Sequence, residues 1–262
     1  MKKLQDKIIA ITGASSGIGK SCALLAAKLG ATPILLARSE DSLRAIVEEI
    51  KHKTSNIGFH SLDVTNMEQI DDVVANIHAQ YGRIDMWINN AGYGIFSSFT
   101  DTTLEDIQGM MNVNYLGTVR CTRAVLPYML KQKSGHIVNV ASVAGKLATP
   151  KSSGYSASKF AVIGFTQSLR QELKGSGVSV SSVNPGPVCT PFFDHADPAG
   201  DYRRSVEKFM VTPESVAQAI LHTIHTRQGD ITIPRYMQIG VVLSHLFPRF
   251  FERLIAPLLN KK

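Results

Sequence analysis

The chain has 262 residues, of which 44% are hydrophobic and 19% charged, an ordinary globular composition that excludes disorder and collagen-like repeats. Its formal net charge is +7, but residues 235–262 carry +4 of it, and the remaining +3 is too weak and scattered to indicate nucleic-acid binding. The three cysteines, Cys22, Cys121 and Cys189, form no CxxC pair, so the sequence argues against a disulfide framework and against a metal site, and it favours the reducing cytoplasm.

Short apolar and β-branched runs alternate with longer amphipathic stretches along the chain. The predicted strands are residues 7–12, 33–38, 57–63, 84–89, 136–141, 178–183 and 230–233. Strict alternation of strand and helix predicts parallel strands joined by right-handed crossovers. We therefore predict the α/β class, with a doubly wound parallel sheet of about seven strands in one domain (residues 1–234), followed by an apolar, basic extension (residues 235–262) packed on the same domain.

Several predicted helices carry recognisable start signals. Ser39 is placed to cap a helix that runs to Ile50, and Thr212-Pro213 puts proline at the first position of a later helix. Two capping boxes predict further helix starts, Thr65-x-x-Glu68 and Thr102-x-x-Glu105. Residues 185–211 break the alternation with a long, proline-containing connection, a kind of segment that is usually functional.

The first predicted strand runs into a glycine-rich turn, Gly13-Ala14-Ser15-Ser16-Gly17-Ile18-Gly19, and then into a helical stretch. Such a turn cradles phosphate, because glycine lets the backbone approach the anion and the helix N-terminus binds it. We expect Ser15 and Ser16 to contact phosphate or ribose there. A second hypothesis is a loose Walker A motif of an ATP or GTP phosphohydrolase, Ala14-x-x-x-x-Gly19-Lys20-Ser21. Its missing first glycine and the lack of a well-placed Walker B aspartate count against it.

Tyr155 and Lys159 stand four residues apart in a predicted helix, which puts both side chains on one helix face. A tyrosine near its usual pKa of about 10 is a poor base at neutral pH, and an adjacent ammonium lowers that pKa. Taken alone, the two residues are better explained as an exposed surface pair. Ser142, however, ends the strand predicted at 136–141 and so puts a hydroxyl at the carboxyl edge of the sheet, where doubly wound sheets bind ligands.

At this point the chain resembles the short-chain dehydrogenase/reductase family, with its Rossmann fold, from residue 7 to about residue 233. The segment from Thr12 to Gly19 resembles the family's cofactor turn, and Asp63-Val64 is similar to its adenine-contacting pair. Further motifs follow in the family's order: Asn89-Asn90-Ala91-Gly92 under the nicotinamide, Asn114-Tyr115-Leu116-Gly117 in a helix, Ser142, Tyr155-x-x-x-Lys159, and Asn184-Pro185-Gly186-Pro187-Val188-Cys189-Thr190 after the sixth strand.

The resemblance implies a role for each of four residues. Tyr155 is the general acid/base of a hydride transfer, Ser142 orients and polarises the substrate carbonyl, Lys159 holds the nicotinamide ribose and lowers the pKa of Tyr155, and Asn114 anchors a water that relays protons to Lys159. The cofactor contacts that it implies are Gly13, Ser15, Ser16, Gly17, Ile18, Gly19, Arg38, Asp63, Val64, Asn90, Ala91, Gly92, Tyr155, Lys159, Pro185, Gly186, Val188 and Thr190.

The end of the second predicted strand indicates which cofactor binds. NAD enzymes of this architecture usually place an acidic residue there, to bind the ribose 2′-hydroxyl. Here the position is Ala37, and Arg38 follows with a guanidinium suited to a 2′-phosphate. Glu40 and Asp41 lie nearby, but we expect them in the first turn of the next helix. The sequence therefore predicts NADP(H).

These observations predict a cytoplasmic NADP(H)-dependent oxidoreductase that acts on a carbonyl or secondary alcohol of a hydrophobic small molecule. The expected substrate pocket contains Ser142, Tyr93, Val143 and Tyr155. The resemblance also implies a homodimer or homotetramer through the helices that carry Asn114 and Tyr155. A non-catalytic NADP-sensing protein of the same fold is a further alternative, against which the intact catalytic set counts.

The tail combines apolar and basic residues. From Pro248 to Leu259 it is predicted to form an amphipathic helix, with Lys261-Lys262 beyond it. We expect it to pack over the substrate pocket or a subunit interface, or else to make reversible, peripheral contact with a membrane. Its charged residues exclude a membrane span.

Overall fold

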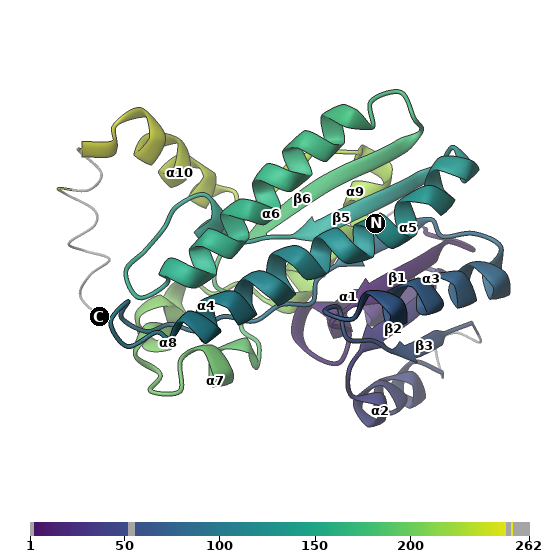
Figure 1. Cartoon of the computed structure of the whole chain (residues 1–262), viewed down its shortest axis with the longest axis horizontal. Helices are drawn as coiled ribbons and strands as arrows, with labels where there is room; N and C mark the ends of the chain where they lie inside the picture. The colour runs from purple at the N-terminus through teal and green to yellow at the C-terminus, as the bar shows by residue number, and fades with distance from the viewer. Residues whose placement is uncertain (1–2, 52–55, 250–252, 254–262) are drawn as a thin grey trace.

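The computed structural model describes residues 3–51, 56–249 and 253. Seven parallel strands form one sheet in the order β3-β2-β1-β4-β5-β6-β7. The strands are β1 (Ile8–Thr12), β2 (Thr32–Ala37), β3 (Gly58–Ser61), β4 (Met86–Asn89), β5 (Gly135–Val140), β6 (Val178–Pro185) and β7 (Asp230–Ile233). Every predicted strand is present, and the predicted doubly wound α/β sheet is confirmed (Figure 1).

Helices cover both faces of the sheet, because successive strand residues point to opposite sides. Ile9 and Ile11 of β1 join the apolar cluster under α1 (Gly17–Lys28), α2 (Glu40–Lys51) and α9 (Pro213–Thr226). Ala10 and Ile8 join the cluster under α3 (Met67–Tyr81), α5 (Gly117–Gln132) and α6 (Ser153–Glu172). β1 is therefore apolar on both sides, as a central strand of a parallel sheet buried between helices requires.

Two predicted helix starts are confirmed, and two are wrong by one residue. Ser39 and Thr212 accept hydrogen bonds from Ser42 N (3.3 Å) and Ser215 N (3.2 Å). However, Asn66 rather than Thr65 caps α3, and Thr103 rather than Thr102 forms the capping box of α4 (Leu104–Met110), with Asp106 as its partner. The reason is local competition, since Thr65 Oγ1 donates to Asp63 and Thr102 Oγ1 donates to Ser98 O, each at 2.8 Å.

Several short elements surround the carboxyl edge of the sheet. Between α4 and α5 the chain forms a π-helical turn, η1 (Met111–Leu116), and η2 (Val143–Gly145) follows β5. The long connection after β6 contains two short helices, α7 (Phe192–Ala196) and α8 (Asp201–Val206), and the 3₁₀ turn η3 (Glu207–Phe209). Figure 1 shows α4, α7 and α8 gathered beyond the tips of the strand arrows.

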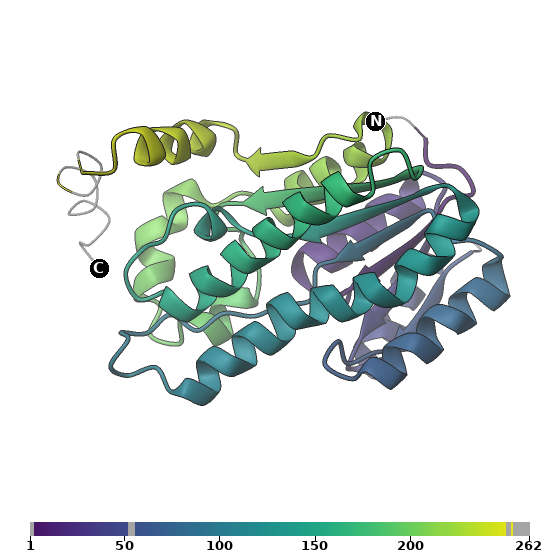
Figure 2. The ribbon, with the colours of Figure 1, turned by 45° about the horizontal axis from the view of Figure 1, so that its top comes forward.

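After β7 the chain forms α10 (Tyr236–Leu246), which runs out beyond the sheet (Figure 2). Met237, Gln238 and Val241 face the body of the protein, but most of the helix is exposed. The tail helix predicted from Pro248 to Leu259 lies largely outside the described residues. No helix in the described part of the chain is long and apolar enough to cross a membrane.

Candidate active site

The glycine-rich turn joins β1 to α1 and is tied to the end of β4, its neighbour in the sheet. Gly13 has φ +65° and lies so close to Ala91 that an added Cβ would stand 2.9 Å from Ala91 Cα. Asn90 Nδ2 donates to Thr12 O (3.0 Å) and to Gly13 O (3.2 Å), while Thr12 Oγ1 accepts from Asn90 N and Ala91 N. Asn90 therefore holds two of the predicted motifs together.

The N-terminus of α1 is open to an anion. A Cβ on Gly19 would stand 2.2 Å from Gly13 O, so only glycine fits where the turn enters the helix. Ser16 is the N-cap residue, but its side chain makes no capping hydrogen bond, and the first turn contains no acidic residue. The free N–H groups and the helix dipole are thus available to a phosphate. Ser15 lies in the same turn, and Ile18 packs on the core below it.

The turn after β6 lies over this cradle. A Cβ on Gly17 would stand 3.1 Å from Thr190 Cγ2, so the segment from Pro185 to Thr190 approaches the glycine turn from the far half of the sheet. Gly186 N donates to Ile233 O at 2.7 Å, and buried Val188 pairs with Val211. These contacts fix the turn at the edge where β1 and β4 diverge, which is the usual crevice for a dinucleotide.

Arg38, Asp63 and Tyr93 form a polar group at one end of the crevice. Burial pushes the pKa of Asp63 upward, but hydrogen bonds from Thr65 and the charges of Arg38 and Arg120 together hold it below its ordinary value. Burial and the charge of Asp106 raise the pKa of Tyr93, and Arg38 opposes them. The Arg38 guanidinium therefore lies within electrostatic reach of both side chains. Sequence reasoning missed Arg120, which carries no motif.

Val64 is buried beside Asp63, and Gly117 at the start of α5 allows this close packing. A Cβ on Gly117 would stand 2.8 Å from Val64 Cγ2. Glu40 and Asp41 lie in the first turn of α2, as predicted, and Glu40 pairs with Arg44.

Tyr155 and Lys159 are both buried at the carboxyl edge of the sheet, on the first turns of α6. Ser142, two residues after the end of β5, is hydrogen-bonded with the Tyr155 hydroxyl; its Oγ also accepts from Ala144 N at 3.1 Å and donates to Pro185 O at 3.3 Å. Lys159 Nζ donates to Val140 O at 3.0 Å and stands 5.8 Å from the centroid of the Tyr155 ring. The fold therefore brings the three predicted catalytic side chains together.

Burial governs both pKa values, and for Tyr155 the direction differs from the prediction. Desolvation raises the pKa of Tyr155 above its ordinary value, and the hydrogen bond from Ser142 offsets only part of this rise. Desolvation lowers the pKa of Lys159 to about 8. The lysine was predicted to lower the pKa of Tyr155, but its ammonium faces the Val140 carbonyl and the tyrosine ring, and here burial of the phenol dominates.

Asn114 lies in the π-helical turn η1 and connects it to the catalytic helix. Its Nδ2 donates to Tyr93 O (2.8 Å) and Ser158 Oγ (2.9 Å), and its Oδ1 accepts from Tyr93 N (2.9 Å). A Cβ on Gly92 would stand 2.8 Å from Asn114 Oδ1 and 3.5 Å from Lys159 Nζ. Single π-helical turns are frequent at functional sites, and this one turns Asn114 toward Lys159.

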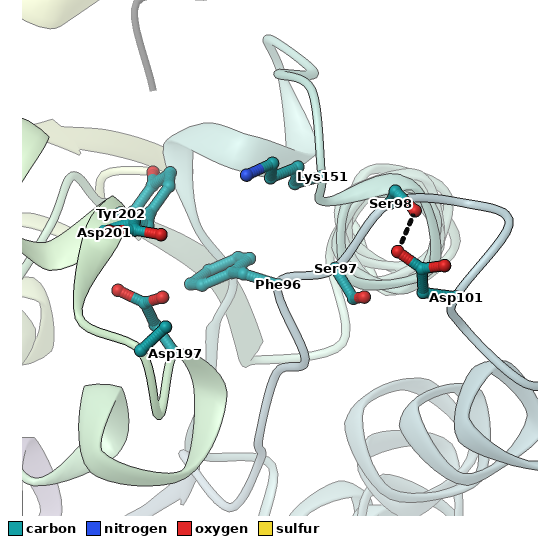
Figure 3. A pocket seen from close by; sticks show the side chains of 9 residues that line it. Phe96, Ser97, Ser98, Asp101, Lys151, Asp197, Asp201 and Tyr202 are labelled. Atoms are coloured by element: carbon teal, nitrogen blue, oxygen red, sulfur yellow. Dashed lines mark hydrogen bonds between the residues drawn. The ribbon is translucent and has the colours of Figure 1, made fainter.

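An aromatic cluster extends from Tyr155 toward the outside. The Phe96 ring lies 5.5 Å from that of Tyr155 and stacks on Tyr202 of α8 at 4.4 Å, while Phe192 of α7 lies 5.7 Å from Tyr155. Beyond Phe96 a cavity of about 160 Å³ opens (Figure 3). It is lined by Phe96, Ser97, Ser98, Asp101, Lys151, Asp197, Ala199, Asp201 and Tyr202.

Two predicted pocket residues take different places. Val143 directly follows Ser142 in η2 and is partly buried. Tyr93 turns its hydroxyl toward α4, where it would stand 2.3 Å from a Cβ on Gly109. Phe192 and Tyr202 were not singled out in the sequence, because the long connection that carries them has no periodic pattern. The paired Phe192-Phe193 inside a polar loop was the one available signal.

The Walker A alternative lacks the geometry it needs. Lys20 Nζ pairs with Glu49 Oε2 of α2 at 2.9 Å, and Ser21 Oγ donates to Glu214 Oε1 of α9 at 3.3 Å. Both side chains thus face neighbouring helices, whereas a P-loop needs them on phosphate and Mg²⁺. Within residues 3–51, 56–249 and 253, no three His, Cys, Asp or Glu side chains gather as a metal site would require.

Known proteins share this chain's sequence and fold. The family model for short chain dehydrogenase matches residues 7–199. An uncharacterised oxidoreductase of Bacillus subtilis is 35% identical over 99% of this chain and 74% of its own, and one of Staphylococcus saprophyticus is 37% identical over 89% and 99%. A short-chain dehydrogenase/reductase from Burkholderia phymatum in complex with NAD superposes with a TM-score of 0.88, at 28% identity over 95% of this chain and 96% of that one. The alcohol dehydrogenase of Thermococcus sibiricus complexed with 5-hydroxy-NADP superposes with a TM-score of 0.78, at 27% identity over 87% of this chain and 96% of that one.

Proposed function

The chain belongs to the short-chain dehydrogenase/reductase family, and we propose from that premise that it is an NADP(H)-dependent oxidoreductase of carbonyl compounds or secondary alcohols. The observation that carries the proposal is the buried group of Ser142, Tyr155 and Lys159 at the edge of the sheet, beside an open helix N-terminus. When bound, the nicotinamide supplies or accepts a hydride at its C4 atom.

Tyr155 exchanges the proton that accompanies the hydride. In the reductive direction the Tyr155 hydroxyl gives its proton to the carbonyl oxygen, and its raised pKa keeps it in the protonated form at neutral pH. Ser142 Oγ, already hydrogen-bonded to Tyr155, orients the same oxygen and stabilises its developing negative charge. In the oxidative direction Tyr155 must first release its own proton, and the resulting phenolate then takes the proton from the alcohol.

Lys159 and Asn114 support this exchange. The Lys159 ammonium, with a pKa of about 8, is mostly protonated at neutral pH, and it holds the nicotinamide ribose. It also stabilises the phenolate that forms after Tyr155 has lost its proton. Asn114, fixed by Tyr93 and Ser158, anchors a water through which Lys159 restores the proton.

The cofactor is NADP(H) rather than NAD(H). The acidic residue that would bind a ribose 2′-hydroxyl is replaced by Ala37, and Arg38 presents a charge within reach of Asp63 and Tyr93. A 2′-phosphate is recognised by this guanidinium. In this proposal Asp63 and Val64 contact the adenine ring. Asn90, Ala91 and Gly92 contact the ribose and the nicotinamide. The turn after β6 contacts the nicotinamide side through Pro185, Gly186, Val188 and Thr190.

The substrate is a small molecule with a hydrophobic body. The rings of Phe96, Phe192 and Tyr202 form an aromatic cluster beside Tyr155, and Phe96 and Tyr202 also line the cavity. We also propose a homodimer or homotetramer. Leu116 of η1 and Phe160 of α6 are exposed on the two elements that carry Asn114 and Tyr155, and light scattering on the intact chain tests this.

The decisive experiment follows NADPH absorbance with a panel of carbonyl compounds and secondary alcohols. Tyr155→Phe should lower kcat by roughly a thousandfold or more and leave the Kd for NADPH within about twofold, because only the transferable proton is lost. Tyr128→Phe, which alters a tyrosine packed on His78 and remote from the site, is the matched control. Wild-type turnover by Tyr155→Phe would refute the assignment.

A further inference from the structure

The exposed side of α10 is an unpartnered apolar surface in the described part of the chain. The exposed side chains within α10 follow helical spacing and cover an arc of roughly 120° at 100° per residue, and exposed Phe247 follows at the end of the helix. They are Tyr236 (54% exposed), Ile239 (63%), Val242 (44%), Leu243 (44%), Leu246 (65%) and Phe247 (57%). A contiguous apolar surface of this kind marks an interaction site.

The opposite side of α10 packs on the turn after β6 and on neighbouring residues of the domain. Val241 is buried, and Met237 packs so closely on the turn after β6 that a Cβ on Gly186 would stand 2.5 Å from Met237 Sδ. Gln238 Oε1 accepts from Lys146 Nζ at 3.3 Å and from Thr232 Oγ1 at 2.5 Å. The helix is therefore held with its apolar arc outward, beyond the end of β7 (Figure 2).

The charged residues between 235 and 249, which stand at the two ends of α10, are both basic. Arg235 precedes α10 and Arg249 follows it, both exposed, and residues 235–249 contain no aspartate or glutamate. The sequence continues to Lys262 with three further basic residues and one acid, Glu252. An apolar helix face flanked by cations matches a bilayer surface with anionic headgroups.

The same charges disfavour a second copy as the occupant. An isologous antiparallel pair of α10 helices would bring Arg235 of one copy toward Arg249 of the other, with no acidic partner on either helix. We propose that α10 docks this protein reversibly on an anionic lipid surface, with the apolar arc in the interface and the arginines on phosphate headgroups. This docking goes beyond the proposed reaction and does not depend on it.

The test is sedimentation of the full-length protein with vesicles of equal parts phosphatidylglycerol and phosphatidylcholine. We expect binding at about 0.05 M NaCl that falls as salt rises to about 0.5 M, and little binding to phosphatidylcholine alone. Ile239→Glu and Leu246→Glu should each weaken binding about tenfold or more, since each puts an anion in the apolar arc. Leu130→Glu is the control, because Leu130 is an exposed leucine at the far end of α5.

A second pair of variants keeps the apolar arc intact. Arg235→Gln and Arg249→Gln should lower the affinity and reduce its dependence on salt, with unchanged circular dichroism. Failure of the wild-type protein to bind the anionic vesicles at low salt would overturn the proposal. Equal losses of vesicle binding in Leu130→Glu and Leu246→Glu would also overturn it. The same holds if the protein does not bind vesicles and light scattering shows that Ile239→Glu dissociates a dimer. Vesicle binding is read without turnover, so it stands or falls separately from the oxidoreductase proposal.

Discussion

Lys159 is a buried lysine whose ammonium donates to the Val140 carbonyl and faces the Tyr155 ring, with no carboxylate among these contacts, and its ionisation is therefore coupled to stability. Its pKa in the folded protein, about 8, lies below the ordinary lysine value, so between these two pH values the unfolded chain binds more protons than the folded chain. The contribution of Lys159 to stability must then increase with pH across that window, because the penalty for burying the charge disappears as the ammonium deprotonates.

We expect this effect in a comparison of wild type with Lys159→Met. The free energy of unfolding of the wild type relative to the variant should increase by about 3 kcal/mol at most between pH 7.5 and pH 10.5, at 1.4 kcal/mol per pKa unit. Urea denaturation at a series of pH values measures it. Lys131→Met removes an exposed ammonium from the end of α5 and serves as the control. A difference that stays constant or decreases with pH would contradict the burial argument.

Arg38 carries the prediction of cofactor preference. Arg38→Ala should weaken the binding of NADPH by about 2 kcal/mol, which is more than tenfold in Kd, because a charge-assisted contact to the 2′-phosphate is lost. NADH should bind nearly as before. Arg44→Ala is the matched control, since Arg44 pairs with Glu40 on the same side of the fold. Fluorescence titration with both nucleotides decides the question, and equal weakening of both would remove Arg38 from the phosphate site.

The residues that sequence reasoning could place are those whose positions follow from short spacing. Tyr155 and Lys159 lie one helical turn apart, and Ser142 follows a strand, so their meeting at the sheet edge could be predicted. Phe96 and Tyr202 stack although they are far apart in the chain, and no periodic pattern links them. The direction of the Tyr155 pKa shift was likewise out of reach, because burial depends on how loops close over the ring.

At the scale of elements, helix starts depend on which polar side chain wins the local competition. Asn66 Oδ1 accepts from Gln69 N at 3.1 Å and so begins α3, while the neighbouring Thr65 is held by Asp63. Asn66→Ala should therefore lower the free energy of unfolding by about 1 kcal/mol. Glu68→Gln, which alters the other member of the capping box expected from the sequence, should change it by only a few tenths. Urea denaturation measures both values, and a larger loss of stability in Glu68→Gln than in Asn66→Ala would indicate that Thr65 caps the helix.

The strands were predictable because most of them are short apolar runs buried on both faces, with the edge strands β3 and β7 partly exposed, and the helices between them supply the crossovers. The start of α4 was less so, since Thr102 and Thr103 both fit a cap and only Thr103 has Asp106 three residues later in contact. The π-helical turn η1 carries no sequence period of its own. It arises where α4 and α5 join and Asn114 is held by Tyr93 and Ser158.

For the whole molecule, a parallel sheet between two layers of helices follows from the alternation of elements, but the place of the tail does not. The expectation that the extension packs on the domain applies to only one side of α10, through Met237, Gln238 and Val241. The apolar sequence of α10 does not indicate which of its residues pack on the domain. The residues that they contact, Gly186 and Lys146, lie far back in the chain.

Truncation separates the anchored side of α10 from the rest of the extension. A chain that ends at Ile233 loses the packing of Met237 on Gly186 in the turn after β6. It also loses the hydrogen bond between Gln238 and Lys146, and Lys146 stands four residues after Ser142 in the chain. Burial of about two apolar side chains is lost, which predicts about 3 kcal/mol, or roughly ten degrees of Tm, and a higher Kd for NADPH. A chain that ends at Phe247 keeps all these contacts, and we expect its Tm and NADPH affinity to match the full-length protein. Calorimetry and nucleotide titration on the two truncations make the comparison, and identical behaviour of both would mean that α10 does not support the turn after β6.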